Sequence, residues 1–349
     1  MSGIDGVDRY DAQLTVAQTK VGSVVTMAAE ISAPDPRASE IAAGTQAIFD
    51  TGVRAIATLA DSTNARQTNT TAKIQPKYSH FTASKNRPVS VGHDAEGPLI
   101  LFLHGIGGNR TNWDPQIAAL AGRFHVAAMD LRGYGDCPLG PTQTTVDNYC
   151  DYILEIQAQL GAKSLILCGL SYGAWIATSF AMRHPETLAG LVLAGGCTGM
   201  SEASKAERDA FRTARETPLD AGKTPADFAS DVVNVIAGPN AGEDVRHALL
   251  TSMQAIPANT YRDALNCFTN PIEKFNFSRL DMPVLMMTGA HDTLATPAEI
   301  RTVAARILDA SPRPDVRFEV IKNAGHVCNL ERPESFNTIL CEFLSRVAK

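Results

Sequence analysis

Basic clusters, a signal sequence and metal-binding motifs are all missing from this chain of 349 residues. Its 31 Lys and Arg residues form no run of four, and 37 Asp and Glu residues bring the net charge to −6. We therefore expect neither a nucleic-acid partner nor an anionic membrane partner. The first fifteen residues, MSGIDGVDRYDAQLT, have neither the basic start nor the apolar core of a signal peptide. The longest apolar run near them, Met27–Ala29, is too short to span a bilayer.

Paired cysteines are missing as well. The seven cysteines are an odd number, and their spacing is not typical of a metal site. The sequence also contains no H-E-x-x-H motif. We predict no metal and no cofactor, and free thiols in a reducing, cytoplasmic environment. Most of these residues are expected to be small buried hydrophobic groups: Cys137, Cys150, Cys168, Cys197, Cys267, Cys328 and Cys341.

Residues 1–75 differ from the remainder in being rich in Ala, Thr, Ser and Gln. Two segments are predicted to be helical, Tyr10–Glu30 and Arg37–Ala60, and the polar segment 61–71 reads as a linker. This N-terminal helical extension is either a poorly ordered tail or a helical hairpin. Such a hairpin would pack on the core or on another subunit, so that a homo-oligomer could form through the N-terminal helices.

From Tyr78 onward, short apolar runs alternate with helical patterns. Strands buried on both faces read as apolar runs, and their alternation with helices predicts an α/β fold with a mostly parallel central sheet flanked by helices. We assign residues 76–198 and 276–349 to the two parts of this core. The predicted strands are 99–103, 124–129, 165–168, 188–194, 283–288 and 316–321, and the predicted helices are 114–121, 145–160, 174–184, 297–308 and 333–347.

The alternation stops between residues 199 and 275, where charged helical pieces (201–215, 225–236, 245–254) occur without a convincing strand. We interpret this segment as a helical lid or cap inserted into the core. Arg208, Arg212 and Arg215 lie at helical i, i+4, i+7 spacing. They would favour an acidic substrate if they faced a pocket, but a solvated helix face is the preferred interpretation.

The motif Gly169-Leu-Ser171-Tyr-Gly173 lies between a predicted strand and a predicted helix. A strand that turns at once into a helix forces the serine into strained backbone geometry, and side chains at Gly169 and Gly173 would collide with the neighbouring elements. The serine hydroxyl is then exposed at the start of a helix, where the dipole favours negative charge. Ser171 is therefore the candidate nucleophile.

Asp292 and His326 each follow a predicted strand, and the chain order serine, acid, histidine is the order expected of this arrangement. An imidazole can take the serine proton near neutral pH, and a carboxylate fixes its tautomer. His291 is a rival base, but it precedes the acid. The strand at 188–194 is a rival place for the acid, but no carboxylate follows it until Glu202.

The segment His104-Gly105-Ile106-Gly107-Gly108 follows the strand at 99–103. Gly105 and Gly107 would let the backbone approach a substrate, so that the N–H groups of Ile106 and Tyr172 form an oxyanion hole. We predict a structural role for the His104 imidazole. In Asp130-Leu-Arg-Gly-Tyr-Gly-Asp136, likewise, Asp130 and Arg132 are predicted to hold loops together.

Six of these segments together resemble the α/β-hydrolase superfamily: HGIGGNRTNW, MDLRGYGDC, CGLSYGAWIA, RHPETLAGLVLAGG, PVLMMTGAHDTLATP and NAGHVCNLERPESFN. They look like the branch that contains 3-oxoadipate enol-lactonases and related cofactor-free ester, lactone and carbon–carbon hydrolases. In this resemblance Ser171, Asp292 and His326 match the family triad, and Ile106 and Tyr172 match its oxyanion positions. The first 75 residues have no counterpart in the family pattern.

The resemblance implies hydrolysis of a carboxylic ester, lactone or related acyl bond of a small molecule through an acyl-serine intermediate. Carbon–carbon bond hydrolysis of a ring-fission product would use the same triad, and cofactor-free perhydrolysis is a minor option. A non-catalytic binding protein on a hydrolase scaffold is the alternative of a different class. The lid would set the substrate, which the sequence does not identify.

Overall fold

The computed structural model describes residues 9–18, 23–32, 78–83, 87–92, 97–270 and 273–348. The chain divides into two units, Met1–Lys73 and Ile74–Lys349.

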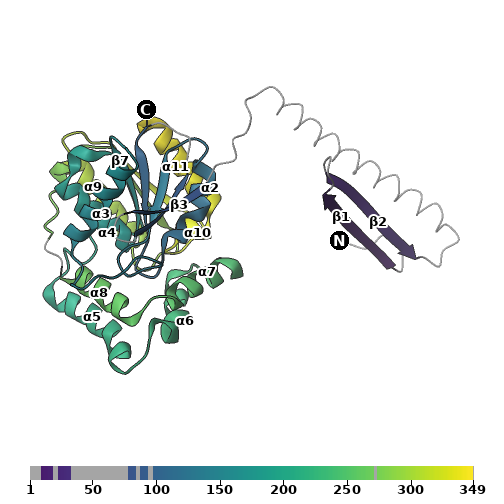
Figure 1. The fold of residues 1–349 in the computed structure, drawn as a ribbon, viewed down its shortest axis with the longest axis horizontal. Helices are drawn as coiled ribbons and strands as arrows, with labels where there is room; N and C mark the ends of the chain where they lie inside the picture. Colours follow the sequence, from purple (N-terminus) through teal and green to yellow (C-terminus); the bar gives the residue numbers. More distant parts are fainter. Residues whose placement is uncertain are drawn as a thin grey trace. The chain divides into compact units, whose positions relative to one another are not determined.

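In the first unit, β1 (Arg9–Gln18) and β2 (Ser23–Ser32) pair as an antiparallel hairpin in which Thr15 lies opposite Thr26 (Figure 1). The predicted helix over Tyr10–Glu30 is therefore wrong. Apolar residues in these strands recur at every second position, which suits a strand rather than a helix. They are Tyr10, Ala12, Leu14 and Val16 in β1, and Val25, Met27, Ala29 and Ile31 in β2.

The second predicted N-terminal helix, Arg37–Ala60, and the predicted linker at 61–71 lie outside the described residues. The expected homo-oligomer was to form through two N-terminal helices. The segment predicted as the first of these helices contributes two strands instead, so it gives no basis for that mode of association.

The second unit contains an eight-stranded sheet in the order β10-β9-β8-β7-β5-β6-β4-β3. The six strands from β10 to β6 in this order pair in parallel, whereas β4 is antiparallel to both β6 and β3. This confirms the predicted, mostly parallel sheet. The strands are β3 Tyr78–Ala83, β4 Arg87–Gly92, β5 Leu99–Leu103, β6 Val126–Met129, β7 Leu165–Leu170, β8 Leu188–Ala194, β9 Val284–Gly289 and β10 Val316–Ile321.

Helices cover both faces of this sheet (Figure 1). In β5, Leu99, Leu101 and Leu103 belong to one hydrophobic core, whereas Ile100 and Phe102 belong to the other. The first core includes α3 (Val146–Gln159), α4 (Tyr172–Arg183) and α9 (Pro297–Ala310). The second includes α2 (Asp114–Leu120), α10 (Cys328–Glu331) and α11 (Pro333–Val347). Strands β5, β6, β7 and β8 are apolar throughout, because both of their faces are covered, whereas the edge strand β10 carries Arg317 and Glu319 and is mostly half-buried. Short 3-10 helices lie at Arg110–Trp113, Pro185–Thr187 and Phe277–Arg279.

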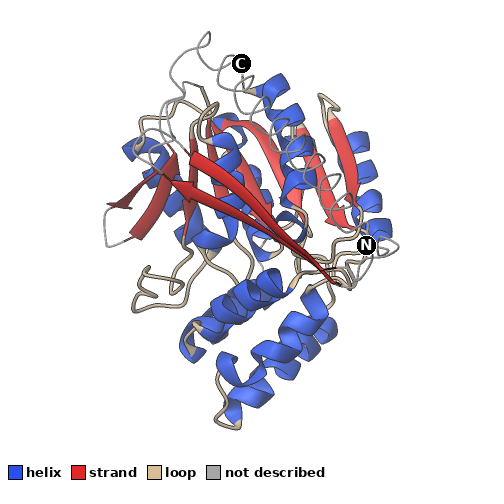
Figure 2. Cartoon of the chain, turned by 90° about the vertical axis from the view of Figure 1, so that its right-hand side faces the viewer, coloured by secondary structure: helices blue, strands red, loops and turns tan. Residues whose placement is uncertain are grey.

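Four helices lie between β8 and β9 and group beyond one end of the sheet (Figures 1 and 2). They are α5 (Lys205–Asp220), α6 (Pro225–Ile236), α7 (Glu243–Gln254) and α8 (Ala258–Thr269); α5 packs on α8, and α6 packs on α7. The sequence analysis missed α8, although Tyr261, Leu265 and Phe268 have helical spacing. Within the described residues, no helix has both the length and the apolar character needed to cross a membrane.

Candidate active site

Ser171 occupies the turn between β7 and α4, with φ of 56° and ψ of −113°. A non-glycine residue with positive φ is strained, and such strain persists only where the surroundings hold it. Two close approaches account for the flanking glycines. A side-chain carbon at Gly169 would overlap the backbone of Gly173, and one at Gly173 would overlap the carbonyl of Leu103. The sharp turn that exposes the Ser171 side chain therefore depends on both glycines.

Asp292 and His326 are brought together from the loops that follow β9 and β10. The distance between His326 Nδ1 and Asp292 Oδ2 is 2.9 Å, and the two residues are only 7% and 4% exposed. Asp292 Oδ1 accepts the backbone N–H groups of Leu294 and Ala295, each at 2.9 Å. The single proton of the Thr288 hydroxyl is shared between the Ala295 carbonyl at 2.8 Å and Asp292 Oδ2 at 3.1 Å. The carboxylate is thus held by three N–H donors, including His326, and can orient the imidazole.

The surroundings of Asp292 stabilise its ionised form. Burial by itself would raise the pKa of this carboxyl group. The hydrogen bond and charge of His326, together with the N–H groups of Ala295 and Leu294, outweigh burial and lower the pKa below its ordinary value. Asp292 is therefore an anion at neutral pH.

Ser171 and His326 line the same cavity, which has a volume of about 550 Å³. Two glycines directly after β8 lie against both residues. A side-chain carbon at Gly195 would lie 3.3 Å from the His326 ring, and one at Gly196 would lie 3.1 Å from the Ser171 carbonyl oxygen. The sequence analysis noticed only that no carboxylate follows this strand. The adjacent glycines Gly195 and Gly196 were the sequence feature that could have indicated a close approach of the backbone to the site.

The loop after β5 lies beside Ser171, because a side-chain carbon at Gly105 would be 3.5 Å from Ser171 Cβ. Ile106 and Tyr172 both line the cavity. Within the described residues, the backbone N–H groups of these two residues donate to no protein acceptor. The Ser252 hydroxyl of α7 lies 3.1 Å from the carbonyl oxygens of both Gly107 and Leu249, so its single proton is shared between them and links this loop to α7.

His104 has the predicted structural role. The Leu131 N–H donates to His104 Nε2 at 3.0 Å, and His104 Nδ1–H donates to the Gly105 carbonyl at 2.8 Å. Burial lowers the pKa of His104 despite the charge of Asp130, so the neutral tautomer required by these bonds is favoured. The rival base, His291, is exposed.

Asp130 and Arg132 also hold loops, as predicted. Asp130 has no exposed surface; it forms an ion pair with Arg110 and accepts the Arg110 N–H at 2.7 Å. The Arg132 guanidinium donates to the Leu139 carbonyl from Nε at 3.1 Å and from Nη2 at 2.8 Å. Both contacts are structural and lie outside the Asp292–His326 pair.

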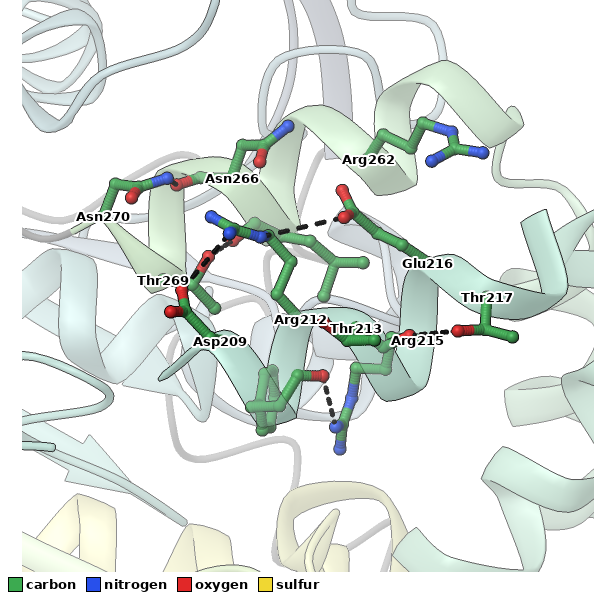
Figure 3. A network of polar contacts seen from close by, with 12 residues as sticks. Asp209, Arg212, Thr213, Arg215, Glu216, Thr217, Arg262, Asn266, Thr269 and Asn270 are labelled. Carbon is green, nitrogen blue, oxygen red and sulfur yellow. Dashed lines mark hydrogen bonds and ion pairs between the residues drawn. The ribbon is translucent and has the colours of Figure 1, made fainter. Parts of the chain in front are cut away.

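The three arginines of α5 do not share one environment. Arg208 donates to the Ala203 carbonyl at 2.5 Å, and Arg212 forms ion pairs with Asp209 and Glu216. Arg215 instead lines the cavity. Figure 3 shows the side chains of Arg212 and Arg215 leaving α5 in opposite directions. The preferred interpretation of a solvated face is wrong for Arg215, because α5 turns this side of its surface toward the cavity.

The remaining cavity wall is largely apolar and includes residues of α5 and α6. Phe211, Phe228, Val232 and Met200 contribute to it. Among the described residues, no cluster of three or more His, Cys, Asp or Glu side chains could hold a metal ion.

Residues 98–333 match the family model of the alpha/beta hydrolase fold. The chain belongs to this family. The hydrolase is 24% identical over 247 residues to 3-oxoadipate enol-lactonase 2 of Acinetobacter baylyi, which covers 70% of this chain and 87% of the relative. It is 26% identical over 271 residues to the pimeloyl-[acyl-carrier protein] methyl ester esterase of Aeromonas hydrophila, which covers 73% of this chain and 99% of the relative.

The fold of the hydrolase is also similar to solved structures. A thermophilic esterase from Thermogutta terrifontis superposes with a TM-score of 0.66 at 23% identity, covering 78% of this chain and all of that chain. The α/β-hydrolase fold and the resemblance to the enol-lactonase branch are thereby confirmed. At the level of the family, the relatives support a hydrolase of esters or lactones.

Proposed function

We propose that this hydrolase cleaves a carboxylic ester or lactone of a small molecule through an acyl-serine intermediate, with Ser171 as nucleophile, His326 as base and Asp292 as the orienting acid. The observation that carries the proposal is the strained Ser171 turn, which opens onto the cavity that His326 also lines. The hydrogen bond of 2.9 Å between His326 and buried Asp292 supports the assignment of base and acid.

In the proposed reaction, His326 Nε2 accepts the Ser171 proton as the hydroxyl oxygen attacks the substrate carbonyl. Asp292 accepts a hydrogen bond from Nδ1–H, which leaves Nε2 as the basic nitrogen, and it stabilises the imidazolium that forms. The Ile106 and Tyr172 N–H groups would bind the developing oxyanion, and their lack of protein acceptors within the described residues supports this role. The His326 imidazolium then donates its proton to the leaving alcohol oxygen as the ester C–O bond breaks and the acyl-serine forms. In the second half, His326 accepts a proton from water as the water oxygen attacks the acyl carbon, and it returns that proton to Ser171 Oγ as the acyl–serine bond breaks.

The test is covalent labelling of Ser171. A fluorophosphonate probe should label the wild-type protein at Ser171, as identified by peptide mass spectrometry. The Ser171→Ala variant should melt at an unchanged temperature but remain unlabelled, with hydrolysis of p-nitrophenyl esters reduced by several orders of magnitude. The Ser201→Ala variant is a matched control that should keep both labelling and activity. Near-wild-type turnover in Ser171→Ala would contradict the proposal.

We also propose a reducing, cytoplasmic location. The seven cysteines support it, because all of them are free thiols.

A further inference from the structure

Strand β10 lies at one end of the eight-stranded sheet and has an open side. Within the described residues it pairs only with β9. Its residues from Val316 to Val320 are half-buried, whereas those of β9 are fully buried. An unpaired strand edge presents N–H and C=O groups that can pair with another strand. This edge is therefore the part of the sheet that is open to a further strand.

The backbone groups that point away from β9 belong to alternate residues of β10. The carbonyls of Asp315 and Ile321 accept N–H groups from the β9 side, at 2.8 and 2.9 Å. Successive residues of a strand direct their N–H and C=O groups to opposite sides. The groups of Val316, Phe318 and Val320 therefore point toward the open edge.

The face of β10 that packs on α11 carries two opposite charges beside this edge. Arg317 and Glu319 are two residues apart, and their side chains are 35% and 36% exposed. Arg317 Nε donates to Glu319 Oε1 at 2.8 Å, and its Nη2 donates to Glu342 of α11 at 2.9 Å. Each carboxylate oxygen has further acceptor capacity, so Glu319 can accept from a second guanidinium.

The other face of β10 is apolar and packs on α9. Val316 and Phe318 pack against the first hydrophobic core, and the guanidinium carbon of Arg301 in α9 lies 4.8 Å from the centroid of the Phe318 ring. Leu308 follows Arg301 by seven residues, which is two helical turns, so it lies on the same side of α9. This leucine is 44% exposed and adds apolar surface on the side of α9 that carries Arg301.

We infer that the open edge of β10 pairs with β10 of a second copy of this chain, antiparallel and about a two-fold axis at Phe318. In this register Phe318 lies opposite its own copy and Val316 lies opposite Val320, so the outward backbone groups of one chain meet those of the other. Arg317 lies opposite Glu319 of the second copy in a pair without backbone hydrogen bonds, where Cα atoms are about 4.5 Å apart. The symmetry makes this ion pair occur twice.

The charges favour this register over the neighbouring ones. With the axis at Arg317, this residue would meet its own copy, and Glu319 would meet Asp315. With the axis at Glu319, the two glutamates would meet. Like charges directly opposite each other are destabilising, whereas opposite charges stabilise a strand pair. Charges of a single sign would repel a second copy in every register and so protect the edge, but the pattern of β10 is complementary to itself.

The experiment exchanges charges between two variants of the full chain. Wild-type protein should dimerise in sedimentation equilibrium. Arg317→Glu and Glu319→Arg each place like charges opposite each other twice, so each should raise the Kd of its own dimer at least about 10-fold. An equimolar mixture of the two variants should form a heterodimer, because every charge then meets an opposite one. Native mass spectrometry distinguishes the heterodimer by its mass.

Arg262→Glu is the matched control. Arg262 of α8 has the same side-chain exposure of 35% and also forms an ion pair, with Asp220, but it lies outside β10 and its flanking helices. Its substitution should leave the Kd unchanged. A wild-type protein that is monomeric at every concentration, association that is unchanged in both charge variants, or a mixture without heterodimer would each overturn the inference.

Hydrogen exchange tests the position of the contact independently. Peptides that cover residues 316–321 should exchange more slowly as the wild-type protein concentration rises, because outward N–H groups such as that of Phe318 become paired. Arg317→Glu by itself should lose this concentration dependence, and its mixture with Glu319→Arg should regain it. Exchange of these peptides that does not depend on wild-type concentration would place any dimer contact elsewhere and overturn the inference.

Discussion

At the scale of single residues, two buried carboxylates follow strands and have different surroundings. Asp292 accepts a hydrogen bond from His326, whereas Asp130 is paired with Arg110. A carboxylate aimed at an imidazole can influence proton transfer, and one aimed at a guanidinium in a loop holds that loop. Because the two carboxylates have different partners, we expect the same Asp-to-Asn substitution to affect catalysis at one position and stability at the other.

Asp292→Asn should lower kcat by about 10⁴-fold, because the amide favours the wrong imidazole tautomer. Asp130→Asn should instead lower the free energy of unfolding by about 1–3 kcal/mol, since it weakens a charged hydrogen bond at a buried site, and should change kcat little. Steady-state kinetics and urea unfolding of both variants check this. A well-folded, inactive Asp130→Asn beside a nearly normal Asp292→Asn would show that the acid is misassigned.

The pH dependence of stability provides a second check on Asp292. Its native pKa is lowered below the ordinary value of 3.8, so the unfolded state binds the proton more readily. The group therefore stabilises the fold at pH values above 3.8, and this contribution is lost as the pH falls through the lower native value. The difference in unfolding free energy between wild type and Asp292→Asn should be constant above about pH 5 and shrink as the pH falls below about 4. A difference that stays constant at the lower pH values as well would contradict the lowered pKa.

At the scale of elements, Glu331 of α10 joins the end of α6 to the loop that carries His326. Its buried carboxylate accepts the N–H of Gly238 at 2.9 Å and the N–H of Gly325 at 2.9 and 3.0 Å. The His326 N–H donates to the Ile236 carbonyl at 2.9 Å. A side-chain carbon at Gly238 would lie 2.6 Å from the Gly325 nitrogen, so the two segments meet backbone to backbone.

Glu331→Ala should lower the free energy of unfolding by about 3 kcal/mol, because two buried N–H groups lose their acceptor. It should also lower kcat, since the loop that positions His326 loses its anchor. Glu331→Gln retains one acceptor oxygen and should cost about 1 kcal/mol. Denaturant unfolding and kinetics of both variants test the expectation, and wild-type stability in Glu331→Ala would refute it. Glu334→Ala, an exposed site in the first turn of α11, is the control.

At the scale of the whole molecule, the cysteines are distributed through the interior, and only Cys341 is less than fully buried. Burial raises the pKa of Cys150, Cys197 and Cys267 to about 12. The thiolate is the reactive form, so these groups are unreactive near neutral pH.

Native protein should therefore react with one equivalent of Ellman's reagent at most, at Cys341, and with seven after denaturation. Treatment with N-ethylmaleimide should leave hydrolysis unchanged, even though Cys197 lines the cavity. Rapid inactivation that maps to Cys197 would contradict this expectation. The Cys341→Ser variant should abolish the native reaction and serves as the control.

Much of the second unit was predictable from local patterns. The apolar runs that became β5 and β8, and the helical periods of α6 and α11, agree with the structure, because burial on two faces or on one stripe leaves a recognisable pattern in the sequence. The N-terminal hairpin was predicted as a helix. Over a few residues, the apolar side chains of this segment fit a helical spacing as well as the two-residue spacing of a strand.

The sequence by itself determined the fold family and the candidate site. The turn at Gly169-Leu-Ser171-Tyr-Gly173 is recognisable because it requires glycine on both sides of the serine for steric reasons. Asp292 and His326 are recognisable because they follow strands in the chain order serine, acid, histidine. Only the tertiary structure decided which arginine of α5 meets the cavity, and that Gly195, Gly196 and Glu331 hold backbone segments close to the site. These features depend on how the helices between β8 and β9 pack against the sheet and its loops, and contacts between residues far apart in sequence leave no periodic pattern in it.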